Sequence, residues 1–170
     1  KAGAFRKELY RNFKYHFQFQ NEKFLFSEVG HAKRLSINVF QINNSNELMF
    51  DHVGNLFLPS TIDACFTSST QTDNIPLIKT LDGEWDTRGH KKRIVNINQS
   101  TLNLFSRFLS DENEDVPVFL NLHSDPLLGV IRKISLAKNT VESFLGKDNV
   151  SVFDGLDETV AQREKIISET

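Results

Sequence analysis

The first forty residues constrain the fold more than any other segment, because their side chains fit two incompatible periodicities. Apolar residues recur every four positions, as on one face of a helix, at Phe5, Leu9, Phe13 and Phe17. Aromatic residues also recur every two positions, as on one face of a strand, at Phe13, Tyr15, Phe17 and Phe19. No proline interrupts residues 1–58. We favour one helix from about residue 4 to 28, with a hairpin of residues 12–19 and 23–29 as the alternative.

The remaining segments predict a sheet between helices. Alternating apolar residues and turn signals predict a strand or a helix end at 35–42, a hairpin over 47–58 around Gly54, and strands at 92–97, 116–122, 127–136 and 149–153. A short helix or a loop is expected after Pro59, a helix over 101–109, and a C-terminal helix over 156–170. The predicted fold class is therefore α+β. A long N-terminal helix packs on a mostly antiparallel sheet of about five strands, followed by a C-terminal helix, in one domain over residues 1–170.

Composition excludes several classes of protein. The hydrophobic share of 39%, with 15 Phe, is enough for a packed core, which argues against disorder. A net charge of −2 argues against a general grip on nucleic acid, which is usually basic. Cys65 is the single cysteine, so an internal disulfide is excluded. No apolar run reaches the length of about 18 residues that spans a bilayer.

The densest cluster of polar residues lies at 84–93 and supplies the candidate ligand-binding residues. We predict that Trp85 stacks on a ligand and that Arg88 or His90 holds an anionic group, with Arg93 at the end of the same loop. Two other interpretations stay open. The loop is solvated with Trp85 folded onto the core, or its cations contact nucleic-acid phosphates.

Motifs for catalysis, metals and cofactors are missing from the sequence. The five histidines and Cys65 show no metal-ligand spacing. The chain contains no Gly-x-Ser-x-Gly motif for a nucleophile and no glycine-rich phosphate loop. We therefore expect a non-enzymatic domain without a metal or a cofactor.

One stretch carries a resemblance to a known family. Asp125-Pro126 sets a turn, an apolar run to Leu136 follows, and helical spacing resumes around residues 141–145. This order resembles the closing segment of Cache-type, extracytoplasmic PAS-like sensor domains and is similar to periplasmic sensor regions of hybrid histidine kinases. The predicted N-terminal helix, hairpin and later strands match the arrangement of that family. The aromatic-plus-aspartate ligand motif of many members has no counterpart in this chain.

The resemblance implies a sensing function. The chain would be the non-enzymatic, periplasmic or extracellular sensor domain of a membrane-anchored receptor, such as a histidine kinase of a two-component system, a chemoreceptor or a diguanylate cyclase. Its partners would be a small ligand or a periplasmic binding protein, and a second copy bound through the N-terminal helix, with no nucleic acid. The alternative is an intracellular protein–protein interaction module of a larger complex. The sensor interpretation depends on the first thirty-odd residues being helical.

Overall fold

The structure, a computed structural model, describes residues 2–42, 47–67, 74–109 and 118–137. The chain divides into two compact units, residues 1–136 and 137–170, and every described helix and strand belongs to the first. The prediction of one domain over residues 1–170 stays a prediction. In chain order the elements are α1 (Ala2–Arg11), β1 (Phe13–Gln20), η1 (Asn21–Lys23), β2 (Arg34–Phe40), β3 (Met49–Leu56), α2 (Ser60–Thr67), η2 (Lys91–Arg93), β4 (Val95–Asn98), α3 (Gln99–Leu109) and α4 (Pro126–Ser135).

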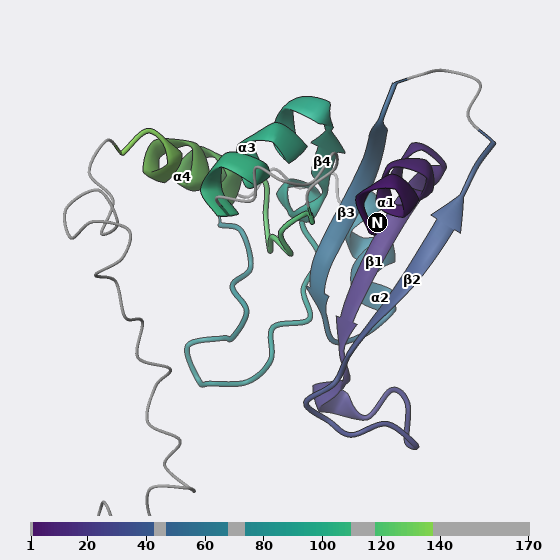
Figure 1. The fold of residues 1–170 in the computed structure, drawn as a ribbon. Helices are drawn as coiled ribbons and strands as arrows, with labels where there is room; N and C mark the ends of the chain where they lie inside the picture. The colour runs from purple at the N-terminus through teal and green to yellow at the C-terminus, as the bar shows by residue number, and fades with distance from the viewer. Residues whose placement is uncertain (1, 43–46, 68–73, 110–117, 138–170) are drawn as a thin grey trace, which may run out of the picture. The chain divides into compact units, whose positions relative to one another are not determined.

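The strands of the described ranges form one sheet in the order β2-β1-β3-β4 (Figure 1). β1 is antiparallel to β2 and parallel to β3, while β3 is antiparallel to β4. The predicted α+β class is confirmed, but the described sheet is mixed and has four strands where about five were expected. Because β1 and β3 are parallel, the carboxyl ends of both central strands lie at the same end of the sheet.

The predicted long N-terminal helix is wrong beyond residue 11. α1 ends at Arg11 and β1 begins at Phe13. Both faces of β1 are packed, since Phe17 and Phe19 contact the cluster that contains Cys65, whereas Phe13 joins a second cluster on the other side. The register between β1 and β2 shifts between Phe13 and Tyr15, and this irregularity places Phe13 on the face opposite to Phe17 and Phe19. From Tyr15 onward the aromatic residues follow the two-residue period of a strand, which prevails over the four-residue one. β1 pairs with β2 and β3, and not with residues 23–29 of the alternative hairpin.

Three later expectations are also corrected. The predicted hairpin over 47–58 is one strand, β3, which continues through Gly54. The predicted strand over 127–136 is the helix α4, with Pro126 in its first turn, where a proline ring suits the helix and no N–H is needed. Of the predicted strand 116–122, residues 118–122 are described, and they form no strand.

Other expectations hold. At 35–42 the strand alternative is the one that forms, as β2, and after Pro59 the helix alternative forms, as α2. α3 matches the helix predicted at 101–109. The strand predicted at 92–97 is present as β4, after the short η2. The strand at 149–153 and the helix at 156–170 lie outside the described residues.

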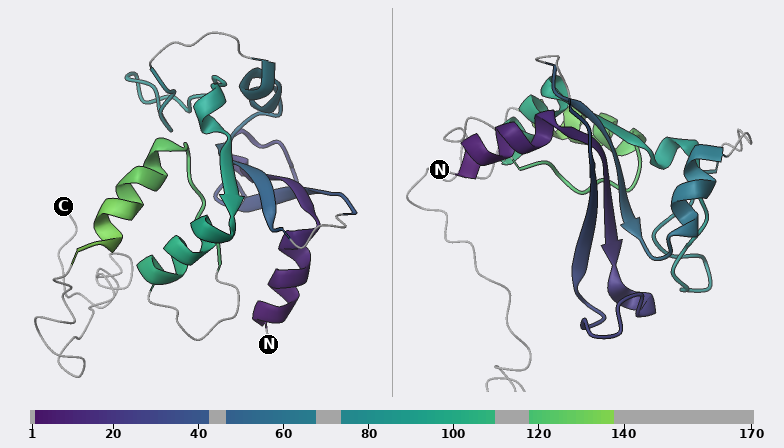
Figure 2. Two further views of the ribbon diagram at one scale, coloured as in Figure 1. Left: turned by 90° about the horizontal axis from the view of Figure 1, so that it is seen from above. Right: turned by 90° about the vertical axis from the view of Figure 1, so that its right-hand side faces the viewer.

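The two faces of the sheet carry separate apolar clusters, and the right-hand view of Figure 2 shows α1 and α2 on opposite sides of it. The larger cluster joins Tyr10 of α1 with residues of β3, β4, α3 and α4, and includes Phe50, Ile97, Phe105 and Ile131. The smaller cluster packs Cys65 of α2 against Phe19, Val53 and Leu56. The sheet is therefore the middle layer of the first unit, and its central strands carry side chains into both clusters.

Candidate functional site

The candidate site is built on a bulge near the end of β3. The register between β1 and β3 shifts after Phe17, so that Gly54 and Asn55 together face a single residue of β1. Asn55 has a φ of 53°, a left-handed conformation that costs most residues free energy but that Asn tolerates better. Bulges redirect side chains and are common near binding sites. This bulge turns the Asn55 side chain to the face of the sheet that carries His52.

Five uncharged polar side chains meet on that face in one hydrogen-bonded group, which we call the polar network. Its members are His16 and Gln20 of β1, His52 and Asn55 of β3, and Asn121. Asn55 Oδ1 accepts hydrogen bonds from Gln20 Nε2 at 2.7 Å and from Asn121 Nδ2 at 3.0 Å. Asn121 Oδ1 lies 3.1 Å from His52 Nε2, and His52 Nδ1 lies 2.9 Å from His16 Nδ1. The polar network thus links the two parallel strands to the segment around Asn121.

The amide orientations assign the protons of both histidines. Because Asn121 Nδ2 donates to Asn55, the Asn121 oxygen is the acceptor that faces His52. His52 therefore donates from Nε2 and has an acceptor at Nδ1, since a neutral imidazole carries one proton. His16 then donates from its own Nδ1, which leaves its Nε2 as an acceptor.

Burial keeps the polar network uncharged. It lowers the pKa of His16 from 6.5 to about 4, and it lowers the pKa of His52 to about 4 as well. The neighbouring His16 lowers the pKa of His52 further, and the hydrogen bond to Asn121 offsets only part of this change. Both imidazoles are therefore neutral at neutral pH, and they act as hydrogen-bonding groups rather than as cations.

The surroundings of the polar network are closely packed. The Phe119 ring lies edge-on to both imidazoles, with its centroid 4.7 Å from that of His16 and 5.2 Å from that of His52. Gly54 allows the segment after Phe119 to approach β3. A Cβ at position 54 would overlap Asn121 Oδ1 and would come within 2.9 Å of the carbonyl oxygen of Leu122.

Two more carboxamide oxygens on this face lack a partner among the described residues. Gln18 Oε1 and Asn38 Oδ1 are both buried and accept no hydrogen bond. Gln18 lies between His16 and Gln20 on the same side of β1, and Asn38 of β2 is directly opposite His16. A buried acceptor without a donor costs free energy until water or a ligand supplies one. This face therefore has unused hydrogen-bonding capacity beside the polar network.

The predicted ligand-binding residues Trp85 and Arg88 contact the protein itself. The half-buried Trp85 ring stacks on Phe57 with centroids 4.6 Å apart, and Lys79 Nζ lies 4.5 Å from the Trp85 centroid. The Arg88 guanidinium pairs with the buried Asp86 carboxylate at 2.6 Å, although 72% of the Arg88 side chain is exposed. This hydrogen-bonded pair lowers the pKa of Asp86.

His90 and Arg93, the other two predicted residues, are buried. His90 Nδ1 accepts a hydrogen bond of 3.0 Å from the backbone two residues later. Arg93 Nη1 donates to the Arg88 carbonyl at 2.8 Å, and Nη2 donates to the carbonyls of Gly54 and Asn55 at 3.1 Å each. Arg93 thus fixes the backbone of the bulge through these two carbonyls. A ligand-binding role for the four residues stays a prediction.

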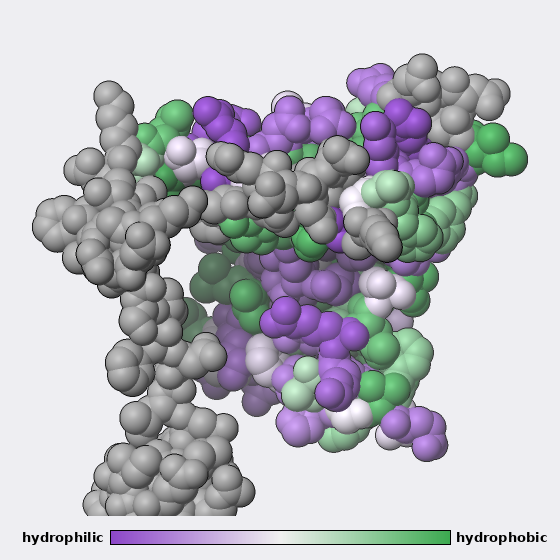
Figure 3. Space-filling model, in the orientation of Figure 1, coloured by the Kyte–Doolittle hydropathy of each residue, from purple (hydrophilic) through white to green (hydrophobic). Residues whose placement is uncertain are grey.

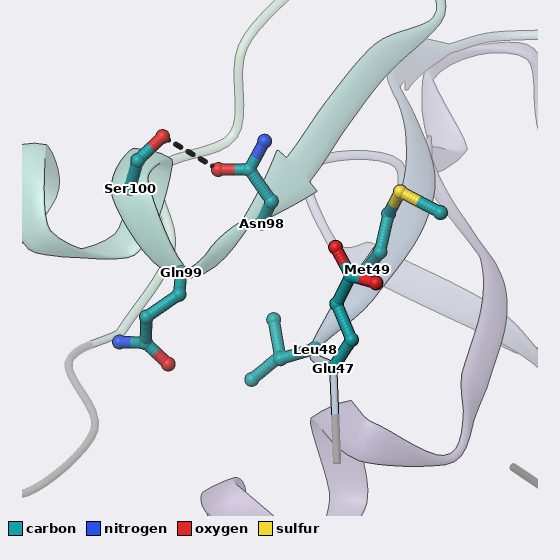
Figure 4. A pocket seen from close by; sticks show the side chains of 6 residues that line it. All are labelled: Glu47, Leu48, Met49, Asn98, Gln99 and Ser100. Atoms are coloured by element: carbon teal, nitrogen blue, oxygen red, sulfur yellow. Dashed lines mark hydrogen bonds between the residues drawn. The ribbon is translucent and has the colours of Figure 1, made fainter. Parts of the chain in front are cut away.

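A pocket of about 360 Å³ lies at the start of β3 and the junction of β4 and α3 (Figure 4). Two of the polar side chains that line it, Asn98 and Ser100, form hydrogen bonds at the start of α3. Asn98 Oδ1 accepts from the Thr101 backbone N–H at 3.0 Å and from Ser100 Oγ at 2.7 Å, which caps the N-terminus of α3. These bonds occupy Asn98 and Ser100, and none of the residues that line this pocket has a buried side-chain atom without a hydrogen-bond partner, whereas Gln18 beside the polar network has one. We therefore place the candidate site at the polar network.

Neither a metal site, nor a membrane-spanning helix, nor a similar known protein indicates the function, as far as the described residues and the comparisons go. The described residues contain no group of three or more His, Cys, Asp or Glu side chains that could hold a metal ion. None of the helices in the described ranges is long and apolar enough to cross a bilayer. No protein-family model, curated protein or solved structure matches this chain. The function is therefore argued from the geometry of the chain.

Sequence reasoning missed the polar network because its members are far apart in the chain. His16 and His52 are separated by 36 positions, and His52 and Asn121 by 69. One local signal was available. Gly54-Asn55 follows the strand-like residues 48–53, and a glycine inside a strand often marks a bulge, whereas we expected a hairpin there.

Proposed function

We propose that this chain is a non-enzymatic domain that binds a small, uncharged polar molecule at the polar network. One observation carries the proposal. Neutral imidazole and carboxamide groups converge on one face of the sheet, beside the unpartnered oxygen of Gln18. Ligand sites combine a few such convergent polar groups with apolar walls, and here Phe119 supplies an aromatic ring.

The ligand should be uncharged because the site offers it no counter-charge. Both histidines are neutral at neutral pH. The buried cation Arg93 directs two of its nitrogens to backbone carbonyls. A charged ligand would lose its hydration without an opposite charge in return. Carboxamides match neighbouring donors and acceptors such as those on a nucleobase edge, so a nucleoside is the first candidate and a sugar or a primary amide the next.

A catalytic role fits these groups less well. A general base works best with a pKa near the pH of the reaction, whereas the pKa values of His16 and His52 are about 4. The two imidazoles also hydrogen-bond to each other and to Asn121 rather than to a side chain that they could activate. Recognition therefore suits this geometry better than proton transfer.

The membrane-receptor context of the sensor prediction stays a prediction. The resemblance rested on a long N-terminal helix and on a strand over 127–136, and the structure has β1 and α4 at these places. Ligand binding is common to the sensor interpretation and to the present proposal, but the proposed site is the polar network rather than residues 84–93. Apolar spans directly before residue 1 and after residue 170 in the parent chain would support a receptor.

Nuclear magnetic resonance can test the binding proposal directly. Adenosine, glucose and acetamide are titrated separately into the ¹⁵N-labelled chain, and the side-chain amide signals of Gln18, Gln20 and Asn121 are followed. We expect at least one probe to shift these signals in a saturable way. Because the domain is proposed to be non-enzymatic, the spectrum of the bound probe should not change with time.

A matched pair of variants gives this test its specificity. Gln18→Ala removes the unpartnered oxygen and should abolish the shifts. Gln99→Ala removes an exposed carboxamide at the pocket of Figure 4 and should leave them unchanged. Saturable shifts that persist in Gln18→Ala, or no response to any of the three probes, would contradict the proposal. New signals from a product would contradict its non-enzymatic part.

A second candidate function is the protein–protein interaction module. The observation that favours it is the exposure of large apolar side chains on β2, where Ile37 is 49% and Phe40 53% exposed. An exposed apolar surface of this kind often marks an interface.

A further inference from the structure

β2 lies at an edge of the sheet, but its residues 35–40 lack the charged residues and proline that are usual in an edge strand. It ends the strand order, so no described strand pairs with its outer side. Ile37 is 49% exposed, Val39 38% and Phe40 53%. In Figure 3 hydrophobic residues lie among polar ones along the right-hand side, where Figure 1 places β2. Edge strands are usually protected by lysine, proline or a bulge, and residues 35–40 contain no charged residue and no proline.

The outer side of β2 also presents unpaired backbone groups. In an antiparallel strand both backbone groups of one residue point to the same side, and successive residues alternate. The Lys33 carbonyl accepts from Asn21 N–H at 3.0 Å, and Gln41 N–H donates to the Asn12 carbonyl at 2.8 Å. Odd-numbered residues of this segment therefore face β1. The N–H and C=O groups of the even-numbered ones point outward.

We propose that two copies of this chain pair through antiparallel β2 strands, with a twofold axis at Ile37. This axis places Ser36 opposite Asn38 of the partner subunit, and Asn38 opposite the partner's Ser36. Both residues present outward-pointing backbone groups, so each pair can exchange two hydrogen bonds. The two four-stranded sheets would then form one continuous sheet.

The side chains of β2 are complementary to themselves about that axis. Leu35 lies opposite the partner's Val39, and Ile37 lies opposite Ile37 of the partner subunit, so apolar residues meet on one face. On the other face the polar side chains of Ser36 and Asn38 lie opposite each other, so no apolar residue faces a polar one at these two positions. Arg34, the one charged residue of β2, lies opposite the partner's Phe40, so no like charges face each other.

This pattern favours a second copy over an unrelated extended segment. An unrelated segment would need its own alternation of apolar and polar residues in the same register, whereas β2 matches itself. The outward backbone N–H and C=O groups of Ser36 and Asn38 are all satisfied by one symmetric contact, as expected for a twofold interface. The inference is independent of ligand binding, because the contact lies at the outer edge of the sheet and the polar network spans the central strands.

The test places charged side chains at position 37, on the proposed twofold axis. Ile37→Lys places two like charges opposite each other, and its exposed position allows the chain to fold. Sedimentation velocity should give twice the chain mass for the wild-type protein and the single mass for Ile37→Lys and for Ile37→Glu. An equimolar mixture of the two variants should return to twice the mass, because opposite charges then meet at the axis. Ile42→Lys, at a position 94% exposed just beyond β2, should remain dimeric.

Several results would overturn the inference. They are a monomeric wild-type chain, an Ile37→Lys variant that stays dimeric, and a mixture that does not reassociate. Hydrogen exchange supplies a check without substitutions. The Ser36 and Asn38 amides should exchange more slowly at high protein concentration than at low, and equal rates in a dimeric sample would place the interface elsewhere.

Discussion

A methyl group at position 54 would overlap the side-chain oxygen of Asn121 and lie within 2.9 Å of the Leu122 carbonyl oxygen. Backbone cannot move aside as a flexible side chain does, so we expect Gly54→Ala to lower the free energy of unfolding by about 1–3 kcal/mol. Denaturation in urea measures the change. At Gly129, within α4, an added Cβ meets nothing within 4 Å. Gly129→Ala should therefore stabilise the chain by roughly 0.5–1 kcal/mol, the usual helix preference for alanine.

An unchanged stability for Gly54→Ala would mean that the segment around Leu122 does not pack on β3, and the polar network would then lose Asn121. Equal losses in the two glycine variants would point to a general sensitivity of the chain instead. The pair thus separates close packing at one position from the effect of adding a methyl group.

Individual site residues were hard to predict because the sequence shows only where polar residues are clustered along the chain, and not which distant residues meet in the fold. Residues 84–93 were predicted as the site because of their charges. Of these residues Arg93 does contact the bulge, but it binds the backbone carbonyls of Gly54 and Asn55. His16 and His52 stand alone in their own neighbourhoods, and only the pairing of β1 with β3 brings them together. No rule of spacing along the chain could have joined them.

At the scale of elements, the end of β3 depends on Arg93. Its guanidinium satisfies the carbonyls of Gly54, Asn55 and Arg88. Arg93→Met keeps much of the apolar stem and removes these donors, which leaves buried acceptors unpaired. We expect a loss of about 2–4 kcal/mol in the free energy of unfolding. Hydrogen exchange should show the largest loss of protection in β3 and η2.

Lys92→Met is the matched control for Arg93→Met, because the neighbouring Lys92 side chain is exposed. Its free energy of unfolding should stay within about 0.5 kcal/mol of the wild-type value. If Arg93→Met proved equally mild, the bulge would be held by the polar network alone.

The elements themselves were predictable where one period dominates. α3 follows a single helical pattern and was anticipated, whereas the residues of β2 suited a strand or the end of a helix. The segment before residue 20 satisfies two patterns, and its outcome depends on packing partners from β3 and α2 that lie far away in the sequence. In α4 the β-branched Val130 and Ile134 suggested a strand, yet both are about half exposed, and the helix is anchored by Ile131.

For the first unit as a whole, the α+β class followed from composition and from the mixture of periods, whereas the strand order did not. A parallel contact between β1 and β3, with β2 between them in sequence but outside them in space, leaves no local trace. That arrangement is nevertheless what places two histidines side by side in the interior, and it has a consequence for stability.

Stability of the first unit should fall as the pH drops from 6.5 to about 4. In the unfolded chain His16 and His52 titrate near 6.5, whereas burial lowers the pKa of each to about 4 in the folded state. Between these values the unfolded chain binds protons that the folded chain refuses, so the free energy of unfolding decreases with decreasing pH. Each histidine can contribute on the order of 3 kcal/mol to the loss. Burial lowers the pKa of His123 in the same direction.

Urea denaturation at several pH values measures this slope. Asp86 does not produce it, because the Arg88 guanidinium lowers the pKa of that carboxyl below its ordinary 3.8, and its contribution is lost only in more acidic solution. His52→Gln keeps a hydrogen-bonding side chain and removes one titration, so it should flatten the slope between pH 6.5 and 4. Gln99→Ala, a change at an exposed position that carries no titratable group, should leave the slope unchanged. A wild-type stability that is constant over this range would show that the two imidazoles accept protons within the fold, and the uncharged site would then be wrong.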